Sequence, residues 1–295
     1  MALAAPVLTA SERRRALWLG VPVYWHLLSL DAPTLTVLWG WALARAAGLH
    51  AEGSALAVLG IGTWLIYVAD RLLDGRPGAP RVHLRERHYF HARHRKELLG
   101  ACAAAGVLLV AGIVRMPAAA RSEDTIVFCA SMVYFAMVHR PMAEAGRGFA
   151  RECAVGVLFA CATAIPAWSL GQGGHGELLG LGALFAALCC VNCIAIEVWE
   201  QGRGSGSGSG ARRFPVSVAA CIVGGSAASL ALTARPEARE LCGAALLSAL
   251  LLWLLDRLQD RTGPEAGWRP SALAMRIAAD AALLTPLLLL APWRG

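Results

Sequence analysis

The stretch TWLIYVADRLLDGR, residues 63–76, brings an apolar helix to an abrupt end in charged side chains. Asp70 and Asp74 are four residues apart and share one helical face, with Tyr67 one turn earlier. A charge in or beside hydrocarbon costs at least about 2.5 kcal/mol unless it is satisfied. The stretch therefore predicts a membrane helix ending at a polar site, where both carboxylates could share a hard divalent cation such as Mg²⁺. The alternative is that the two carboxylates pair with Arg71 or with arginines of the following loop.

The rest of the chain has the composition of a membrane-embedded protein. Of its 295 residues, 57% are apolar and 16% are charged, whereas an ordinary soluble domain has about 25% charged residues. This excludes a single water-soluble globule, a disordered chain and a disulfide framework. We expect an all-α integral membrane protein in which residues 1–295 form a single membrane domain of about nine transmembrane helices. The expected helices cover residues 32–48, 54–73, 97–114, 125–138, 152–170, 178–199, 214–233, 241–256 and 272–292.

Basic residues are distributed unequally between the two sides of these helices. The N-terminal side carries 19 of the 27 Lys and Arg residues, and the opposite side carries 6. The positive-inside rule then predicts a cytoplasmic N-terminus and an external C-terminus, in a bacterial inner or plasma membrane. The same asymmetry accounts for the net charge of +7 without nucleic-acid binding.

Three segments on the expected cytoplasmic side carry further signals. Residues 1–29 form a cytoplasmic or interfacial N-terminus, of which we expect residues 16–29 to lie along the membrane surface before Asp31, the N-cap of the first span. Residues 75–96 hold seven Lys or Arg and four His residues, and predict a site for an anion or lipid headgroup at Arg85 and Arg87. Residues 200–213 are rich in Gly and Ser and end in Arg212 and Arg213, so they form either a tether or a mobile cover over a cavity.

Two patterns that resemble metal sites favour a simpler interpretation. His88, His91 and His94 recur every third residue, but the arginines around them disfavour zinc. Cys190 and Cys193 form a CxxC pattern within an apolar helix, where thiols are more often packing residues than metal ligands.

Other polar residues also gather near helix ends. Asn192 and Glu200 are separated by about 80° around their helix, so they could face one cavity. Asp256 and Asp260 repeat the DRxxD pattern of residues 70–74 in a more interfacial position. Arg276 and Asp280, four residues apart within the last helix, are expected to form an intramembrane ion pair or, in a transporter, a coupling pair.

In this order, the motifs resemble those of the UbiA superfamily of intramembrane prenyltransferases. The family motif NDxxDRxxD overlays on residues 66–74, with the DRxxD half kept and the leading Asn-Asp replaced by Ile-Tyr. The second family motif, NxxRDxxxD, overlays on residues 192–200, with Asn192 and Glu200 matching and Ile196 in place of the central Asp. Further similarities lie at Leu30 to Pro33, at Tyr134 with His139 and Arg140, and at Ile165 to Trp168.

The resemblance implies nine helices around a central cavity and a Mg²⁺-dependent transfer of a prenyl group from a prenyl diphosphate to an aromatic or lipid acceptor. It implies that Mg²⁺ is held by Asp70, Asp74, Asn192 and Glu200, and that Tyr67 lies beside the reacting carbon. The diphosphate would meet Arg71, Arg85, Arg87, Asn192, Arg212 and Arg213. The alternatives are a terpene cyclase of the same fold, a catalytically inactive relative that binds lipid, and a transporter.

Overall fold

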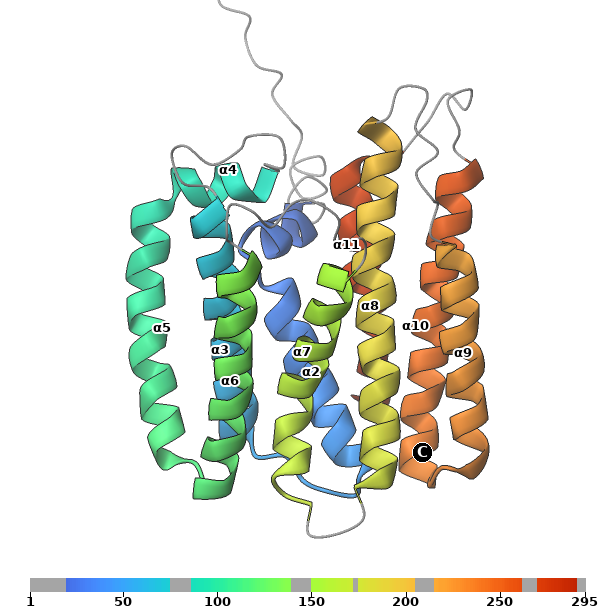
Figure 1. Ribbon diagram of the computed structural model, residues 1–295, viewed down its shortest axis with the longest axis horizontal. Coiled ribbons are helices and arrows are strands. Elements are labelled where there is room, and N and C mark those ends of the chain that lie inside the picture. The colour runs from blue at the N-terminus through green and yellow to red at the C-terminus, as the bar shows by residue number, and fades with distance from the viewer. Residues whose placement is uncertain are drawn as a thin grey trace, which may run out of the picture.

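Residues 20–74, 86–138, 150–171, 175–204, 215–261 and 270–290 are described by the structure, a computed structural model. Every regular element in these ranges is helical, which confirms the all-α class. A short helix, Gly20–Leu27, comes first. The elements that follow it (Figure 1) are α2 (Asp31–Ala46), α3 (Gly53–Asp74), α4 (Glu86–Arg93), α5 (Arg95–Arg115), α6 (Ala118–Val138), α7 (Ala150–Trp168), α8 (Gly176–Gly204), α9 (Val216–Thr233), α10 (Pro236–Arg261), α11 (Ala272–Ala282) and the 3-10 helix η2 (Thr285–Leu290).

Six of these helices are long and apolar enough to cross a membrane, namely α3, α5, α7, α8, α9 and α10. A seventh span results if Gly20–Leu27 and α2, which meet at 89°, count as one broken span. Each of the nine expected segments falls on a helix, but nine spans are not confirmed. The α2 helix has 16 residues and α11 has 11, where a straight span needs about 20.

The other two departures from the expected spans have local causes. The α6 helix carries Arg121, Glu123 and Asp124 near its start, which lowers its apolar character. The expected helix 272–292 stops at Ala282 and continues only as η2. Pro286 disfavours α-helical backbone at the residue before it and has no N–H to donate, so the α-helix ends ahead of it.

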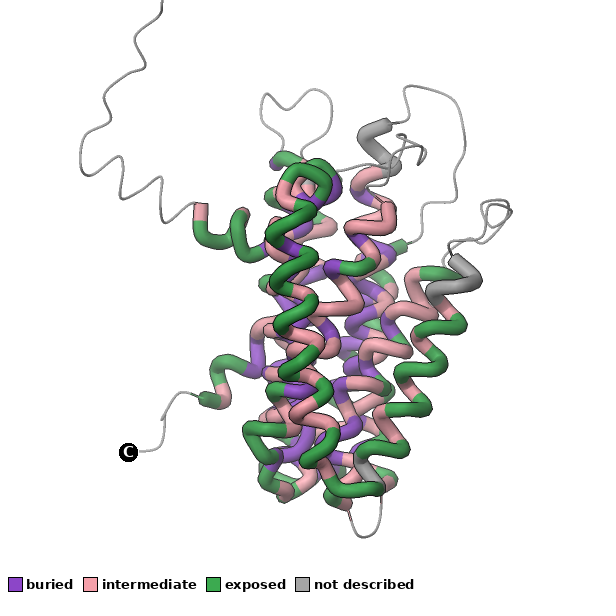
Figure 2. Tube along the Cα trace, turned by 90° about the vertical axis from the view of Figure 1, so that its left-hand side faces the viewer, coloured by how far each residue is buried: buried purple, intermediate pink, exposed green. Residues whose placement is uncertain are grey.

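The outer helices expose apolar side chains that only lipid would cover. In α5, Leu98 is the buried residue, while Val107 and Val114 are 70% and 67% exposed. Ile126 of α6 is exposed to a similar extent. Figure 2 shows exposed residues along whole outer faces, with the buried ones gathered inside. Soluble proteins rarely present apolar surface on this scale, whereas a lipid-facing helix requires it.

The buried core joins the N-terminal and C-terminal parts of the chain. Trp39 of α2 stacks on Phe185 of α8 with ring centroids 4.3 Å apart. The Trp39 indole N–H also donates to the backbone carbonyl of Leu283, at 2.8 Å. Buried indole nitrogens need such a partner, and here the bond fixes α2 against the end of α11.

The α7 and α8 helices approach each other closely at Gly156. A Cβ atom on this residue would lie 2.7 Å from Cys190 Sγ and 2.8 Å from the Cys190 backbone nitrogen. The absence of a side chain at Gly156 therefore permits this packing. It holds α8, which supplies Asn192 and Glu200, at a fixed distance from α7.

Polar residues collect at one end of the bundle. In Figure 1, α4 lies across the upper ends of α3 and α5, and α11 lies beside the upper half of α8. Asp31 begins α2, and the Gly20–Leu27 helix lies at 89° to it. Side chains from α2, α3, α4, α8 and α11 can therefore meet at this end.

Candidate functional site

Asp31 lies where the short helix Gly20–Leu27 turns into α2. It is the first residue of the helix, and the N-cap is Leu30, which makes no side-chain capping bond, so the expected N-cap role of Asp31 is wrong. The Asp31 carboxylate instead accepts the Ala32 N–H at 2.9 Å. Its other oxygen lies 2.8 Å from His26 Nδ1. The bend between the two helices, at which Ser29 adopts a φ of 56°, therefore brings His26 onto Asp31.

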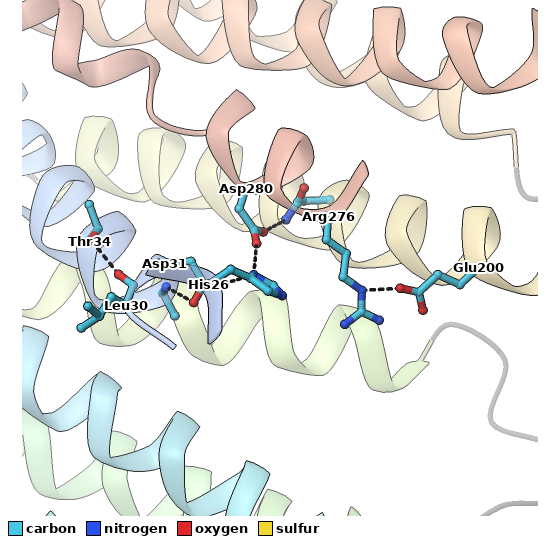
Figure 3. Close-up of polar contacts among 9 residues, drawn as sticks. His26, Leu30, Asp31, Thr34, Glu200, Arg276 and Asp280 are labelled. Atoms are coloured by element: carbon cyan, nitrogen blue, oxygen red, sulfur yellow. Dashed lines mark hydrogen bonds and ion pairs between the residues drawn. The ribbon is translucent and has the colours of Figure 1, made fainter. Parts of the chain in front are cut away.

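Asp280 of α11 joins the same group from the opposite end of the sequence. Its Oδ2 lies 3.6 Å from His26 Nδ1, and its Oδ1 accepts a hydrogen bond of 3.1 Å from Asn192 Nδ2 of α8. Figure 3 shows the His26 ring between the carboxylates of Asp31 and Asp280. This cluster links the Gly20–Leu27 helix, α2, α8 and α11 through His26, Asp31, Asn192 and Asp280.

One turn away along α11, Arg276 forms an ion pair with Glu200 of α8. The two side chains are 7% and 12% exposed. Arg276 and Asp280, expected to pair with each other, thus each have a partner on another element (Figure 3). Two polar contacts therefore join α8 to α11: the hydrogen bond from Asn192 to Asp280 and the ion pair of Glu200 with Arg276.

The carboxylates of α3 also lie beside cationic or basic side chains. Asp70 forms an ion pair with Arg71, and Asp74 lies 3.5 Å from Nε2 of His88 in α4. The Arg71 guanidinium lies over the Tyr67 ring, 5.3 Å from its centroid, and Tyr67 meets Phe159 edge-on. The structure thus agrees with the pairing alternative raised for Asp70, and Tyr67 supports Arg71 through a cation–π contact.

Arg87 of α4 is a half-buried cation that is incompletely hydrogen bonded. Its Nε is buried and has no hydrogen-bond partner among the described residues, and the same holds for Nε of Arg71. Burial, followed by repulsion from Arg71 and Arg276, lowers the pKa of Arg87 well below its ordinary value. Asp31 and Asp280 act in the opposite direction and compensate part of this effect. Because an arginine keeps its charge in proteins, an additional anion beside the guanidinium would stabilise it.

A further arginine, missed by the sequence reasoning, belongs to this end. Arg151, at the start of α7, is hydrogen bonded to Tyr134 and interacts electrostatically with Asp70 and Asp74. The sequence signal that could have identified Arg151 is its position at the start of an apolar stretch. The expected sites Arg85, Arg212 and Arg213 lie outside the described residues, as do residues 1–19 and most of the Gly/Ser-rich segment.

Two of the three repeated histidines, His91 in α4 and His94 just after it, are hydrogen bonded to the backbone one turn earlier. His91 Nδ1 lies 2.8 Å from the Arg87 carbonyl oxygen, and His94 Nδ1 lies 3.0 Å from that of Phe90. In the described ranges, neither these histidines nor the cysteines form a group of three close metal ligands. The cysteines are free thiols.

The second DRxxD pattern has a structural role. Asp256 accepts hydrogen bonds from the Trp199 indole at 2.9 Å and from the Ser217 hydroxyl, which ties α10 to α8 and α9. Asp260, one turn later, is exposed.

The residues expected to hold Mg²⁺ supply oxygen donors, the ligand type that Mg²⁺ prefers. Asp70 and Asp74 remain one turn apart at the end of α3, and their oxygen donors are of the type that suits a shared Mg²⁺. Asp70 is engaged with Arg71 and Asp74 with His88, and Asn192 and Glu200 are engaged with Asp280 and Arg276. Across the described part of the chain, one group of three His, Cys, Asp or Glu residues has its ligand atoms within 4.8 Å of one another, and it is His26, Asp31 and Asp280.

Comparison with protein-family models, with curated proteins and with solved structures gave no match. What the geometry shows is that partly or fully buried carboxylates and guanidinium groups from five elements lie at one end of an apolar helical bundle.

Proposed function

We propose that the chain is an intramembrane prenyltransferase of the UbiA type, with nine helices across the membrane and its polar site on the cytoplasmic side. It would transfer the prenyl group of a prenyl diphosphate to an aromatic or lipid acceptor. The observation that carries this proposal is the half-buried guanidinium of Arg87, whose buried Nε is unpartnered. Arg71 and Arg276 interact with it electrostatically, and Asp31 and Asp280 offset part of this positive charge. Such a group favours a polyanion, and the lipid-facing helices favour one with an apolar tail.

The diphosphate is assigned to Arg87 and Arg71. Guanidinium groups bind phosphate oxygens through charge-assisted hydrogen bonds, often in pairs. Both unpartnered Nε–H groups are available as donors, and Tyr67 holds the Arg71 guanidinium over its ring. Arg85, Arg212 and Arg213 would add donors, as the family resemblance implies. The prenyl tail would then extend among the apolar helices.

In the reaction, the bond between the allylic carbon and the diphosphate oxygen breaks, and its electron pair stays on the oxygen. The acceptor carbon or heteroatom then forms a bond to the allylic cation and loses a proton. Arg87 and Arg71 stabilise the charge that develops on the leaving diphosphate, because they are already oriented and shielded from water. When bound, Mg²⁺ would supply additional charge neutralisation at Asp70 and Asp74, with Asn192 and Glu200 as the facing half of the implied site.

The proposal is tested with the purified chain, prenyl diphosphates of several lengths, Mg²⁺ and an extract of membrane lipids. We expect release of diphosphate together with a prenylated lipid detectable by mass spectrometry. A prenylated product identifies transfer, whereas a hydrocarbon product without acceptor identifies the cyclase alternative. The proposal is wrong if no prenyl diphosphate is consumed, and tight metal-independent lipid binding without turnover would then identify an inactive relative.

A matched pair of arginines within α4 sharpens the test. Arg87→Gln should weaken prenyl diphosphate binding by about 10-fold to 100-fold, since a hydrogen bond to a charged group contributes about 1.5–3 kcal/mol. Arg93→Gln changes an exposed arginine of the same helix and should alter binding less than about 2-fold, the size of a screened surface charge effect. Equal effects of the two substitutions would exclude Arg87 as the diphosphate site.

A further inference from the structure

The cluster of His26, Asp31 and Asp280 has a feature that prenyl transfer does not explain. It places two carboxylates and an imidazole from three separate segments within 4.8 Å of one another, measured between ligand atoms. The imidazole is 4% exposed, and the two carboxylate side chains are 16% and 21% exposed. Two carboxylates this close inside a membrane protein are stabilised by a positive charge between them, which either a protonated His26 or a bound cation supplies.

The spacing of the donor atoms suits a divalent cation. Nitrogen and oxygen ligands lie about 2.0–2.2 Å from such a metal, so two ligands at octahedral or tetrahedral angles are about 2.8–3.6 Å apart by the same distances. His26 Nδ1 lies 2.8 Å from Asp31 Oδ2 and 3.6 Å from Asp280 Oδ2. Both values match the edges of a coordination polyhedron, and both involve the same nitrogen.

Asn192 supplies an independent observation. It is 6% exposed, and its Nδ2 donates to the Asp280 oxygen that does not face His26. Its Oδ1 is buried and has no hydrogen-bond partner among the described residues. Because this oxygen shares a carbon atom with Nδ2, it lies beside Asp280 as well. A buried amide oxygen without a partner costs free energy, so the orientation of Asn192 is fixed by its hydrogen bond to Asp280 rather than by its own oxygen.

We propose that His26, Asp31 and Asp280 form a binding site for a divalent transition-metal cation of the Zn²⁺ or Mn²⁺ type. The imidazole donor favours these ions over Mg²⁺, which prefers oxygen ligands alone. Asn192 orients Asp280 from outside the site, as hydrogen-bonded neighbours of metal ligands commonly do. This site is separate from the carboxylates of α3.

The bound cation has a defined mechanical consequence. It connects the surface helix Gly20–Leu27 to the start of α2 and to α11. The first two elements lie near the beginning of the sequence, and α11 lies near its end. Since metal binding to the folded state stabilises that state by mass action, the cation would hold the polar end of the bundle closed around Arg276 and Glu200.

The test uses the full chain in detergent, stripped with a chelator and titrated with ZnCl₂ or MnCl₂ alone. Calorimetry and metal analysis after desalting should give one tightly held equivalent and a raised melting temperature. Asp280→Asn and His26→Gln should each weaken binding by at least about 10-fold to 100-fold, the loss seen even for neighbours of metal ligands. Two controls should leave binding unchanged: Asp260→Asn removes an exposed carboxylate, and His94→Gln removes a histidine outside the cluster.

Less than one equivalent on the wild-type chain would overturn the proposal, as would unchanged affinity in a variant that elutes as a folded monodisperse species. If Asp280→Asn fails to fold, His26→Gln carries the same test because it keeps a polar side chain at the surface helix. No prenyl diphosphate is present in the titration. A failure here therefore leaves the proposed prenyl transfer standing, and a failure of prenyl transfer leaves this site testable.

Discussion

The ion pair between Arg276 and Glu200 gives a quantitative prediction about how α8 and α11 are joined. The two side chains are 7% and 12% exposed, so neither charge is well solvated once its partner is removed. Removing one partner of a buried ion pair costs about 3–5 kcal/mol, because the remaining charge stays buried. We expect Glu200→Gln and Arg276→Gln each to destabilise the fold by an amount of this order.

The double variant shows whether Glu200 and Arg276 stabilise the fold as a pair or independently of each other. With both charges gone, no uncompensated charge remains, so the combined loss should be smaller than the sum of the single losses by about 1–3 kcal/mol. The assay is urea unfolding in detergent followed by circular dichroism, on the four members of the cycle. Strictly additive losses would refute the pairing and would leave Glu200 available as a metal ligand, as the family resemblance implies.

Three further predictions concern packing, pH and topology. Gly156→Ala should lower the melting temperature markedly, because its Cβ would lie 2.8 Å from the Cys190 backbone nitrogen, and an unchanged melting temperature would mean that α7 and α8 are further apart. Burial lowers the pKa of His91 below its ordinary 6.5, so the unfolded chain binds the proton more readily and stability, full above about pH 6.5, falls as the pH drops towards the lowered value. His91→Gln should flatten that fall in melting curves at pH 7.5 and pH 5, and an equally steep fall would contradict the assignment. Single cysteines at Ser205 and Glu237, in an otherwise cysteine-free chain, should react with an impermeant maleimide from opposite sides of oriented vesicles, whereas same-side reaction would contradict the topology.

The helices could be predicted from the sequence because long apolar runs are strong local signals. The expected segment 54–73 matches α3 within one residue at each end. The end of α11 was missed because a mean over an apolar window does not detect the single Pro286 that interrupts it. The start of α2 was missed by one residue, since Asp31 both begins the helix and binds the backbone N–H of its neighbour.

The residues of the site could be predicted individually, but their partners could not. The charges of Asp70, Glu200 and Asp280 stood out because each lies in or beside an apolar run. Their partners depend on the packing of helices that are distant in sequence: His26 and Asp280 are separated by 254 positions, and no periodicity connects them. Helical spacing suggested Arg276 as the partner of Asp280, whereas the structure places Glu200 against Arg276.

The central claim is that the polar end of the bundle ionises a prenyl diphosphate, and the most direct measurement is diphosphate release by three forms of the purified chain. The account predicts Mg²⁺-dependent release by the wild-type chain and a loss of about 10²-fold or more in Asp70→Asn, the scale of losing one preorganised electrostatic contact. Asp260→Asn is the matched control in the second DRxxD pattern, preferable to Asp256, whose carboxylate binds Trp199 and Ser217. It should keep wild-type activity. Full activity in Asp70→Asn, or an equal loss in both variants, would contradict the claim.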